Sequence, residues 1–213
     1  MKSIRLFYIV IILALTSLAC FSTSTQSAQS DVLFSDDFSD TSKKWDQVTD
    51  SSGTTDYYNN AYRILVNDTN YDAWANPGSE SFIDTRTEVD ATKNTGPDDN
   101  DFGINCRYID ENQFYYAVIS SDGYYGIMKM TGDGSNPIGR DSMLESDKII
   151  QGAATNHIRF DCVGSTLTLY VNGSQLDQQT DSDYTTGNVG LIAGTFGTGG
   201  TDILFDNFYI YKP

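Results

Sequence analysis

The strongest constraint on the fold lies in the last quarter of the chain, where apolar and polar residues alternate over short segments. The alternation runs through residues 156–176 and resumes through residues 187–211, with glycine-rich breaks between segments. A period of two is typical of strands with one buried face, and Asn-Gly at 172–173 suits a tight hairpin turn. The pattern predicts antiparallel strands whose buried faces carry Ile158, Phe160 and Cys162, then Leu167, Leu169 and Val171, then Phe205, Phe208 and Ile210.

Segments of the same kind fill the chain from residue 31 onwards. No segment has a convincing apolar period of 3.6 residues, so little helix is expected. One all-β domain accounts for a chain of 213 residues. The expected strands and hairpins span residues 31–38 (beside the last strand), 54–66, 70–78, 81–92, 102–110 and 112–130, the last turning at 121–123.

Several stretches resemble a known group of folds. The run N-H-I-R-x-x-x-x-G-x-x-L-x-L-Y-V-N-G begins at Asn156, G-x-V-G-L and I-L-F-D-N-F-x-I follow it, and D-D-F-S-D lies near Asp37. Together they resemble the concanavalin A-like jelly rolls, and among these the laminin G-like domains and the domains related to 3-keto-disaccharide hydrolases. The resemblance covers Val32 to Pro213 and implies an antiparallel two-sheet jelly-roll sandwich. Function stays open, because such sandwiches serve as lectins, hydrolases and scaffolds.

The N-terminus resembles a bacterial lipoprotein signal peptide over residues 1–19. Lys2 and Arg5 precede an apolar run, as in secretory signals. The Leu-Ala-Cys that ends at Cys20 resembles the lipoprotein box, in which the cysteine is lipidated. Ser17 departs from the leucine usual in that box.

Two localisations follow from this N-terminus. On the lipoprotein reading, residues 20–30 are a flexible polar tether, and residues 31–213 form a domain anchored to a membrane outside the cytoplasm. Cleavage near Ala28 would instead give a secreted protein.

The acidity of the chain limits its partners. It has 13 Lys and Arg against 29 Asp and Glu, a formal charge of −16. Loss of Lys2 and Arg5 with the signal leaves 11 basic against 29 acidic residues, hence −18. Such a field repels phosphate and sulfate, so nucleic acid is not expected as a partner. Neutral glycans and divalent cations remain.

Two further cysteines, Cys106 and Cys162, fall on the apolar faces of expected strands. Export would place them where disulfides persist. A bridge between them would close a long loop, which the loop-entropy model values at roughly 4 kcal/mol. Two buried free thiols are the alternative.

Catalytic residues are harder to find. Glu88 and Asp90 resemble part of the E-x-D-x-E motif of concanavalin A-like glucanases, but the third carboxylate is missing because Thr92 and Lys93 follow Ala91. The sole histidine, His157, sits where laminin G-like domains place a structural residue. No catalytic set of the 3-keto-disaccharide hydrolases can be matched, so catalysis is disfavoured and no catalytic residue is predicted.

The sequence supplies more material for glycan binding. Sugars stack their C–H faces on aromatic rings and pair their hydroxyls with amides, carboxylates and guanidinium groups. The chain has 14 Tyr and 2 Trp, although Tyr is also favoured in strands for packing alone. The predicted ligand-binding residues are Tyr58, Trp74, Tyr115 and Tyr125 as an exposed platform, with Asn105 and Arg107 as polar partners.

A structural calcium ion is the expected cofactor. The resemblance implies that the first and last strands pair, which would bring Asp36, Asp37 and Asp206 together as hard oxygen ligands. The acidic loop at residues 98–101 is a rival site. Solvated turns without a metal ion are the alternative for both, and Asp-rich turns are more often of that kind.

These observations favour a non-catalytic, lectin-like carbohydrate-binding domain of a lipid-anchored envelope protein. The alternatives are a glycoside hydrolase of the 3-keto-disaccharide type and an envelope scaffold or interaction module. Two carboxylates, or a histidine with a carboxylate, on a concave sheet face would favour the hydrolase. Aromatic rings exposed there would favour the lectin over the scaffold.

Overall fold

The computed structural model describes residues 31–213. The expected signal peptide (1–19), the lipidation site Cys20 and the tether (20–30) lie outside the described residues. Among the described residues, no helix is long and apolar enough to cross a membrane.

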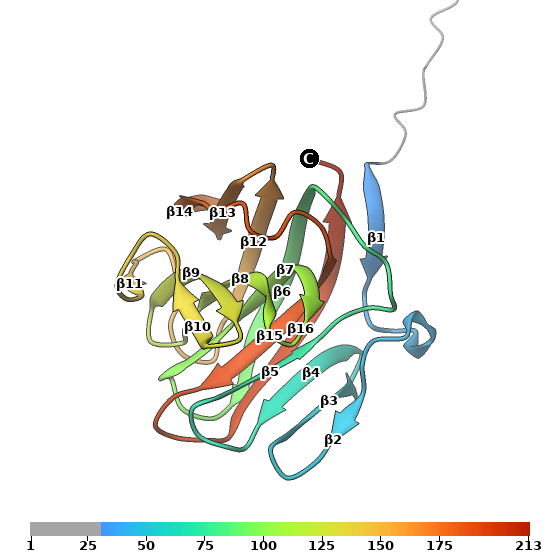
Figure 1. The fold of residues 1–213 in the computed structure, drawn as a ribbon. Helices are drawn as coiled ribbons and strands as arrows, with labels where there is room; N and C mark the ends of the chain where they lie inside the picture. The colour runs from blue at the N-terminus through green and yellow to red at the C-terminus, as the bar shows by residue number, and fades with distance from the viewer. Residues whose placement is uncertain (1–30) are drawn as a thin grey trace, which may run out of the picture.

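All the named strands of the described chain belong to two antiparallel sheets (Figure 1). Within residues 31–213, a nine-stranded sheet has the order β14-β13-β12-β6-β16-β4-β3-β2, with β1 paired to β16. Its strands are β1 (Val32–Asp36), β2 (Val48–Thr49), β3 (Gly53–Tyr58), β4 (Ala61–Val66), β6 (Thr85–Thr95), β12 (Thr155–Val163), β13 (Thr166–Val171), β14 (Ser174–Thr180) and β16 (Thr201–Tyr211).

The second sheet, seven-stranded within residues 31–213, has the order β10-β9-β8-β7-β15-β5, with β11 paired to β9. Its strands are β5 (Tyr71–Ala75), β7 (Asn100–Asp110), β8 (Gln113–Ile119), β9 (Tyr124–Thr131), β10 (Gly134–Pro137), β11 (Leu144–Glu145) and β15 (Asn188–Thr195). The described residues contain one helical element, the 3-10 turn η1 (Thr41–Lys43).

The expected alternation is confirmed where the two sheets meet. Every residue predicted for the buried faces of β12, β13 and β16 is fully buried. The first and last strands pair as expected, with Asp36 opposite Phe208. The strand expected from residue 81 begins only at Thr85, because Phe82 is held in an isolated bridge to Gly187.

The predicted disulfide is confirmed. Cys106 on β7 is bonded to Cys162 on β12, with their Cα atoms 6.8 Å apart. Because β7 and β12 belong to different sheets, the bond links the two layers through the core. It ties together parts of the chain that are 56 residues apart in sequence.

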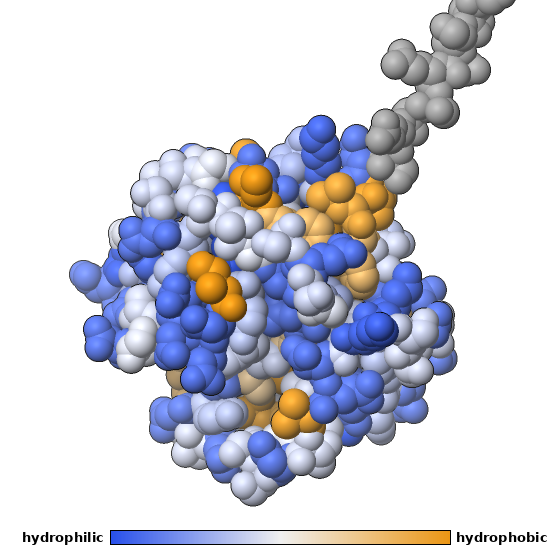
Figure 2. Space-filling model, turned by 45° about the vertical axis from the view of Figure 1, so that its right-hand side comes forward, coloured by the Kyte–Doolittle hydropathy of each residue, from blue (hydrophilic) through white to orange (hydrophobic). Residues whose placement is uncertain are grey.

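The outer surface agrees with the acidic composition. The face in Figure 2 is mostly hydrophilic, with small and separate hydrophobic patches. Isolated apolar side chains on a surface are normal and do not by themselves indicate a partner.

Candidate functional site

The outer face of the seven-stranded sheet carries an unusual set of side chains. In β7, Phe102 and Ile104 point into the core between the sheets, so Asp101 and Asn105 point to the outer face. In β5, Ala75 packs into the core, so Trp74 points outward. This face is therefore lined by residues that the core does not use.

Three aromatic side chains form a ring cluster (Trp74, Tyr108 and Phe114) on this outer face. The ring centroids of Trp74 and Tyr108 lie 5.3 and 5.4 Å from that of Phe114. Phe114 is fully buried, whereas Trp74 and Tyr108 are half-buried. The buried ring thus supports two rings that keep part of their surface in solvent.

A cavity of about 370 Å³ opens on the same face. The three rings do not line it, but Tyr116 does, and the ring centroid of Tyr116 lies 5.7 Å from that of Phe114. The walls of the cavity come from the sheet and from the segment that follows β10, and its polar lining includes Asp72, Asp101 and Tyr116. Met128 and Met143 supply apolar wall, and both pack on the same outer cluster as Trp74. The cavity therefore combines apolar walls with carboxylates.

Two of these carboxylates, Asp72 and Asp101, form a close pair. They come from β5 and β7, and both are paired with Gly194 on the intervening strand β15. A methyl group built on Gly194 would collide with Oδ1 of both residues. Both oxygens therefore reach into the space that a Cβ at position 194 would occupy, and a side chain there would push them aside.

The carboxylate pair sits in an environment that opposes ionisation. Burial raises the pKa of Asp72 to about 6. Burial, and secondly the charge of Asp72, raise the pKa of Asp101 well above its ordinary value. Asp101 is only 7% exposed, and its Oδ1 has no hydrogen-bond partner within residues 31–213. If both carboxyl groups were ionised, their charges beside Gly194 would repel each other.

Tyr116 borders the same cavity through its hydroxyl. Its ring is buried in the outer cluster, and the hydroxyl bonds with the side chain of Ser135 on β10. Burial, and then the charge of Asp72, raise its pKa above the ordinary value. Tyr116 therefore stays protonated and can both donate and accept hydrogen bonds.

The predicted exposed platform is wrong for Tyr115 and Tyr125. Tyr115 is fully buried and Tyr125 is 8% exposed, both in the core between the sheets. In each adjacent tyrosine pair the ring that points outward is the other one, Tyr116 or Tyr124. A period of two separates the faces of a strand but does not say which face is the core.

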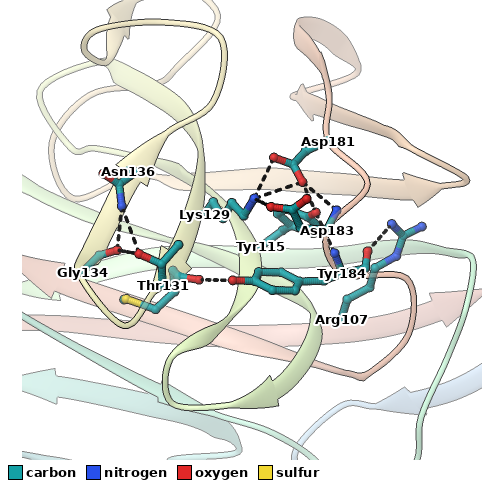
Figure 3. A network of polar contacts seen from close by, with 10 residues as sticks. Arg107, Tyr115, Lys129, Thr131, Gly134, Asn136, Asp181, Asp183 and Tyr184 are labelled. Carbon is teal, nitrogen blue, oxygen red and sulfur yellow. Dashed lines mark hydrogen bonds and ion pairs between the residues drawn. The ribbon is translucent and has the colours of Figure 1, made fainter.

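The hydroxyl of Tyr115 belongs to a polar network at the edge of the core (Figure 3). It donates to Asp181 and accepts from the backbone N–H of Tyr184. Lys129 pairs with Asp181 at 3.0 Å and also with Asp183. The network fastens the loop after β14 to the seven-stranded sheet.

Arg107 is buried and serves the fold rather than a solvent-exposed site, contrary to the prediction. It is 2% exposed, and its guanidinium donates to the carbonyl oxygens of Tyr184, Gly164 and Ile83 at 2.8, 2.6 and 3.2 Å. Its positive φ of 53° marks a bulge in β7 that turns the side chain toward these loops. Burial lowers its pKa.

The remaining predicted ligand residues divide between the two sheets. Asn105 points to the expected face but is fully buried, accepting from Asn76 at 3.0 Å and donating to the carbonyl of Leu191 at 3.3 Å. Tyr58 is exposed but lies on β3 of the nine-stranded sheet, under the guanidinium of Arg63. Of the four predicted platform rings, Trp74 alone lies on the outer face of the seven-stranded sheet.

The predicted calcium ligands do not assemble. Asp36 is buried and accepts hydrogen bonds from Phe38 N–H and from the indole of Trp45, both at 2.9 Å. Asp37 bonds to Ser39, and Asp206 to the N–H of Asn207. Among the described residues, no three His, Cys, Asp or Glu side chains come together as a metal site. The predicted pairing of the first and last strands is therefore confirmed, but the predicted convergence of Asp36, Asp37 and Asp206 is wrong.

Glu88, Asp90 and His157 lie on the outer face of the nine-stranded sheet. The Nδ1 atom of His157 is 2.8 Å from Asp90, and Nε2 is 3.7 Å from Glu88. Val89 between the two carboxylates is fully buried in the core. This group is separated from the cavity by the whole thickness of the sandwich.

Sequence reasoning missed Asp72, Tyr108, Phe114 and Gly194, and assigned Asp101 only to an acidic loop. The alternation in β7 that directs Asn105 to the outer face also directs Asp101 there, so one signal was available. The pairing with Asp72 was not available, because it depends on β15 lying between β5 and β7.

Comparisons with solved structures identify the architecture. The carbohydrate-binding module CBM66 from Bacillus subtilis matches with a TM-score of 0.64 and 16% identity over 79% of this chain and 95% of that one. The fold is a concanavalin A-like jelly roll. A β-glucanase from Bacillus licheniformis shares this jelly roll with a TM-score of 0.60 and 10% identity, covering 84% of this chain and 98% of that one.

The jelly roll also occurs as part of a larger enzyme. A xylan β-1,4-xylosidase from Bacillus halodurans C-125 matches with a TM-score of 0.56 and 13% identity over 84% of this chain but only 39% of its own. Neither the protein-family models nor the curated proteins include a match to the sequence. At these identities, the likeness establishes the jelly-roll fold alone.

Proposed function

We propose that this protein is a lectin-like domain that binds a neutral glycan on the outer face of its seven-stranded sheet. The observation that carries the proposal is the ring cluster beside the cavity. Trp74 and Tyr108 keep part of their ring surface in solvent while Phe114 fixes them from below. Partly exposed rings in fixed positions can stack on the C–H faces of sugars.

The cavity next to the ring cluster supplies the polar half of such a site. Asp72 and Tyr116 offer acceptors and a donor for sugar hydroxyls at its wall. The similarity to a carbohydrate-binding module over nearly that module's full length supports this reading. Rings exposed on this face also favour the lectin over the envelope scaffold.

One observation favours a hydrolase as the second candidate, namely the carboxylate pair of Asp72 and Asp101. Two carboxyl groups, one protonated and one ionised, are the minimum for acid–base cleavage of a glycoside. The geometry argues against it, because the two Oδ1 atoms lie 2.1 and 2.2 Å from one point and so no more than 4.3 Å apart (2.1 + 2.2), whereas retaining hydrolases hold their carboxyl groups ~5 Å apart and inverting ones further. Binding therefore remains the better-supported function.

A glycan array tests the proposal. Saturable binding of the protein to one class of neutral glycan is expected, and Trp74→Ala or Tyr108→Ala should weaken it at least about ten-fold, because stacking on each ring is lost. Tyr209→Ala is the matched control, since Tyr209 stacks on Tyr211 on the nine-stranded sheet. A folded protein that binds no glycan would refute the lectin reading and favour the scaffold.

The same preparation tests the hydrolase. If the protein released reducing ends from a glycan that it binds, and Asp101→Asn abolished that release, the protein would be a hydrolase and not only a binding domain. Intact glycan after prolonged incubation is the expected result.

The lipid anchor and export remain part of the proposal. Cys20 is the expected lipidation site, and secretion after cleavage near Ala28 is the alternative. Incorporation of labelled fatty acid in cells, lost in Cys20→Ser, would support the anchor. Unlabelled protein released into the medium would favour secretion.

A further inference from the structure

The carboxylate pair has no partner that explains it. No Lys, Arg or His within residues 31–213 forms an ion pair with Asp72 or Asp101. The Oδ1 atom of Asp101 also lacks any hydrogen bond within residues 31–213, although only 7% of the residue is exposed. Buried carboxylates are ordinarily paired or bound to a metal ion.

The fold makes room for the pair at a cost. A Cβ at position 194 would lie 2.1 Å from Oδ1 of Asp72 and 2.2 Å from Oδ1 of Asp101, so the glycine in the strand between them leaves both carboxylates in place. Glycine inside a strand lowers stability because it packs nothing and gains backbone freedom on unfolding. The pair thus combines two destabilising features, buried like charges and a glycine, and a bound cation would remove the first.

We propose that Asp72 and Asp101 bind a calcium ion at the wall of the cavity. The unpartnered Oδ1 of Asp101 and the converging Oδ1 of Asp72 are the anchoring ligands. Asn70 and Ser135, which line the same cavity, and solvent supply neutral oxygens. Calcium takes six to eight oxygen ligands in flexible geometry, so it suits a site with two carboxylates and an open side.

The chemistry of the pair selects against other ions. Zinc and copper prefer nitrogen and sulfur ligands, and the cavity lining contains no histidine or cysteine among the described residues. The site is distinct from the one expected at Asp36, Asp37 and Asp206, which lies where β1 pairs with β16. It also differs from the acidic loop at 98–101, of which only Asp101 takes part.

Terbium luminescence provides a test that needs no glycan. Terbium replaces calcium at oxygen sites, and Tyr116 in the cavity lining and Trp74 nearby can sensitise its emission. Chelator-stripped protein should give a saturable signal that calcium displaces. Asp72→Asn and Asp101→Asn should each weaken ion binding at least about ten-fold, because each removes an anionic ligand. Asp133→Asn, which removes an exposed carboxylate in the β9–β10 turn, should leave it unchanged.

Thermal unfolding separates lost binding from lost folding. Without calcium, both variants should melt at or above the wild-type temperature, because each relieves the repulsion within the pair. Added calcium should raise the melting temperature of the wild type and not of the variants.

Several results would overturn the calcium site. One is the absence of saturable ion binding, and another is binding that survives both substitutions. If ion binding were lost in Asp37→Asn alone, the ion would bind at the terminal strands instead. Stabilisation by acid with no response to calcium would mean that the pair shares a proton instead. Glycan binding plays no part in these measurements, so their failure is distinguishable from failure of the lectin proposal.

Discussion

In the absence of metal, the pair of Asp72 and Asp101 should make the protein less stable as the pH rises. The pKa of Asp72 is raised from 3.8 to about 6 by burial. A carboxyl group whose pKa is raised on folding contributes stability that is fully present below the unfolded pKa. That contribution is lost as the pH rises through the folded value.

The size of the effect follows from this shift. The full difference of roughly two pKa units corresponds to about 3 kcal/mol. Only part of it is measurable, because the isoelectric point near 4.1 makes work below pH 5 impractical. At pH 5, one unit below the folded pKa, about 1.4 kcal/mol of the contribution remains, and by pH 8 essentially none does.

The variant Asp72→Asn tests this pH dependence, because its side-chain amide does not titrate. Urea denaturation with chelator at pH 5 and pH 8 should show that the wild type loses about 1.4 kcal/mol relative to this variant over that interval. Asp133→Asn should show no such pH-dependent difference. If the difference in unfolding free energy between wild type and Asp72→Asn is the same at both pH values, the raised pKa of Asp72 does not affect stability as described.

Three further changes have expected outcomes in unfolding experiments. Removing the disulfide by Cys106→Ala with Cys162→Ala should lower the unfolding free energy by about 2–5 kcal/mol, and a reductant should not destabilise the double variant further. Arg107→Met should cost about 3 kcal/mol because three carbonyl oxygens lose their donor, and an unchanged urea midpoint would show that water replaces it. Phe114→Ala should cost about 3–5 kcal/mol by opening a cavity under the ring cluster, and a loss below about 1 kcal/mol would mean that the outer cluster is loosely packed.

The sequence predicted the buried faces of some strands correctly but not those of β8 and β9. Alternation and turn residues were enough for the buried positions of β12, β13 and β16 and for the disulfide. They failed for Tyr115 and Tyr125, because the neighbouring Tyr116 and Tyr124 fit the same pattern on the opposite face. Only the pairing of whole strands decides which ring enters the core.

The carboxylate pair marks a second limit. Asp72 and Asp101 are 29 positions apart by their numbering and lie in segments with no shared motif. They meet only because β15, from far later in the chain, pairs with β5 on one side and β7 on the other. Local patterns carry no information about such strand order, since it is set by how the complete sheet buries its apolar faces.

Strand β7 connects the stability of the jelly roll to the proposed sites. Asp101, near its start, lines the cavity. Cys106 near its middle forms the disulfide to the other sheet, and the neighbouring Arg107 donates hydrogen bonds to backbone carbonyls in three loops. The strand that carries the buried carboxylate is thus fixed by a covalent bond and a clamp of hydrogen bonds. Such anchoring resists the separation that repulsion between Asp101 and Asp72 would otherwise produce, so the pair stays close enough to hold one ion between them.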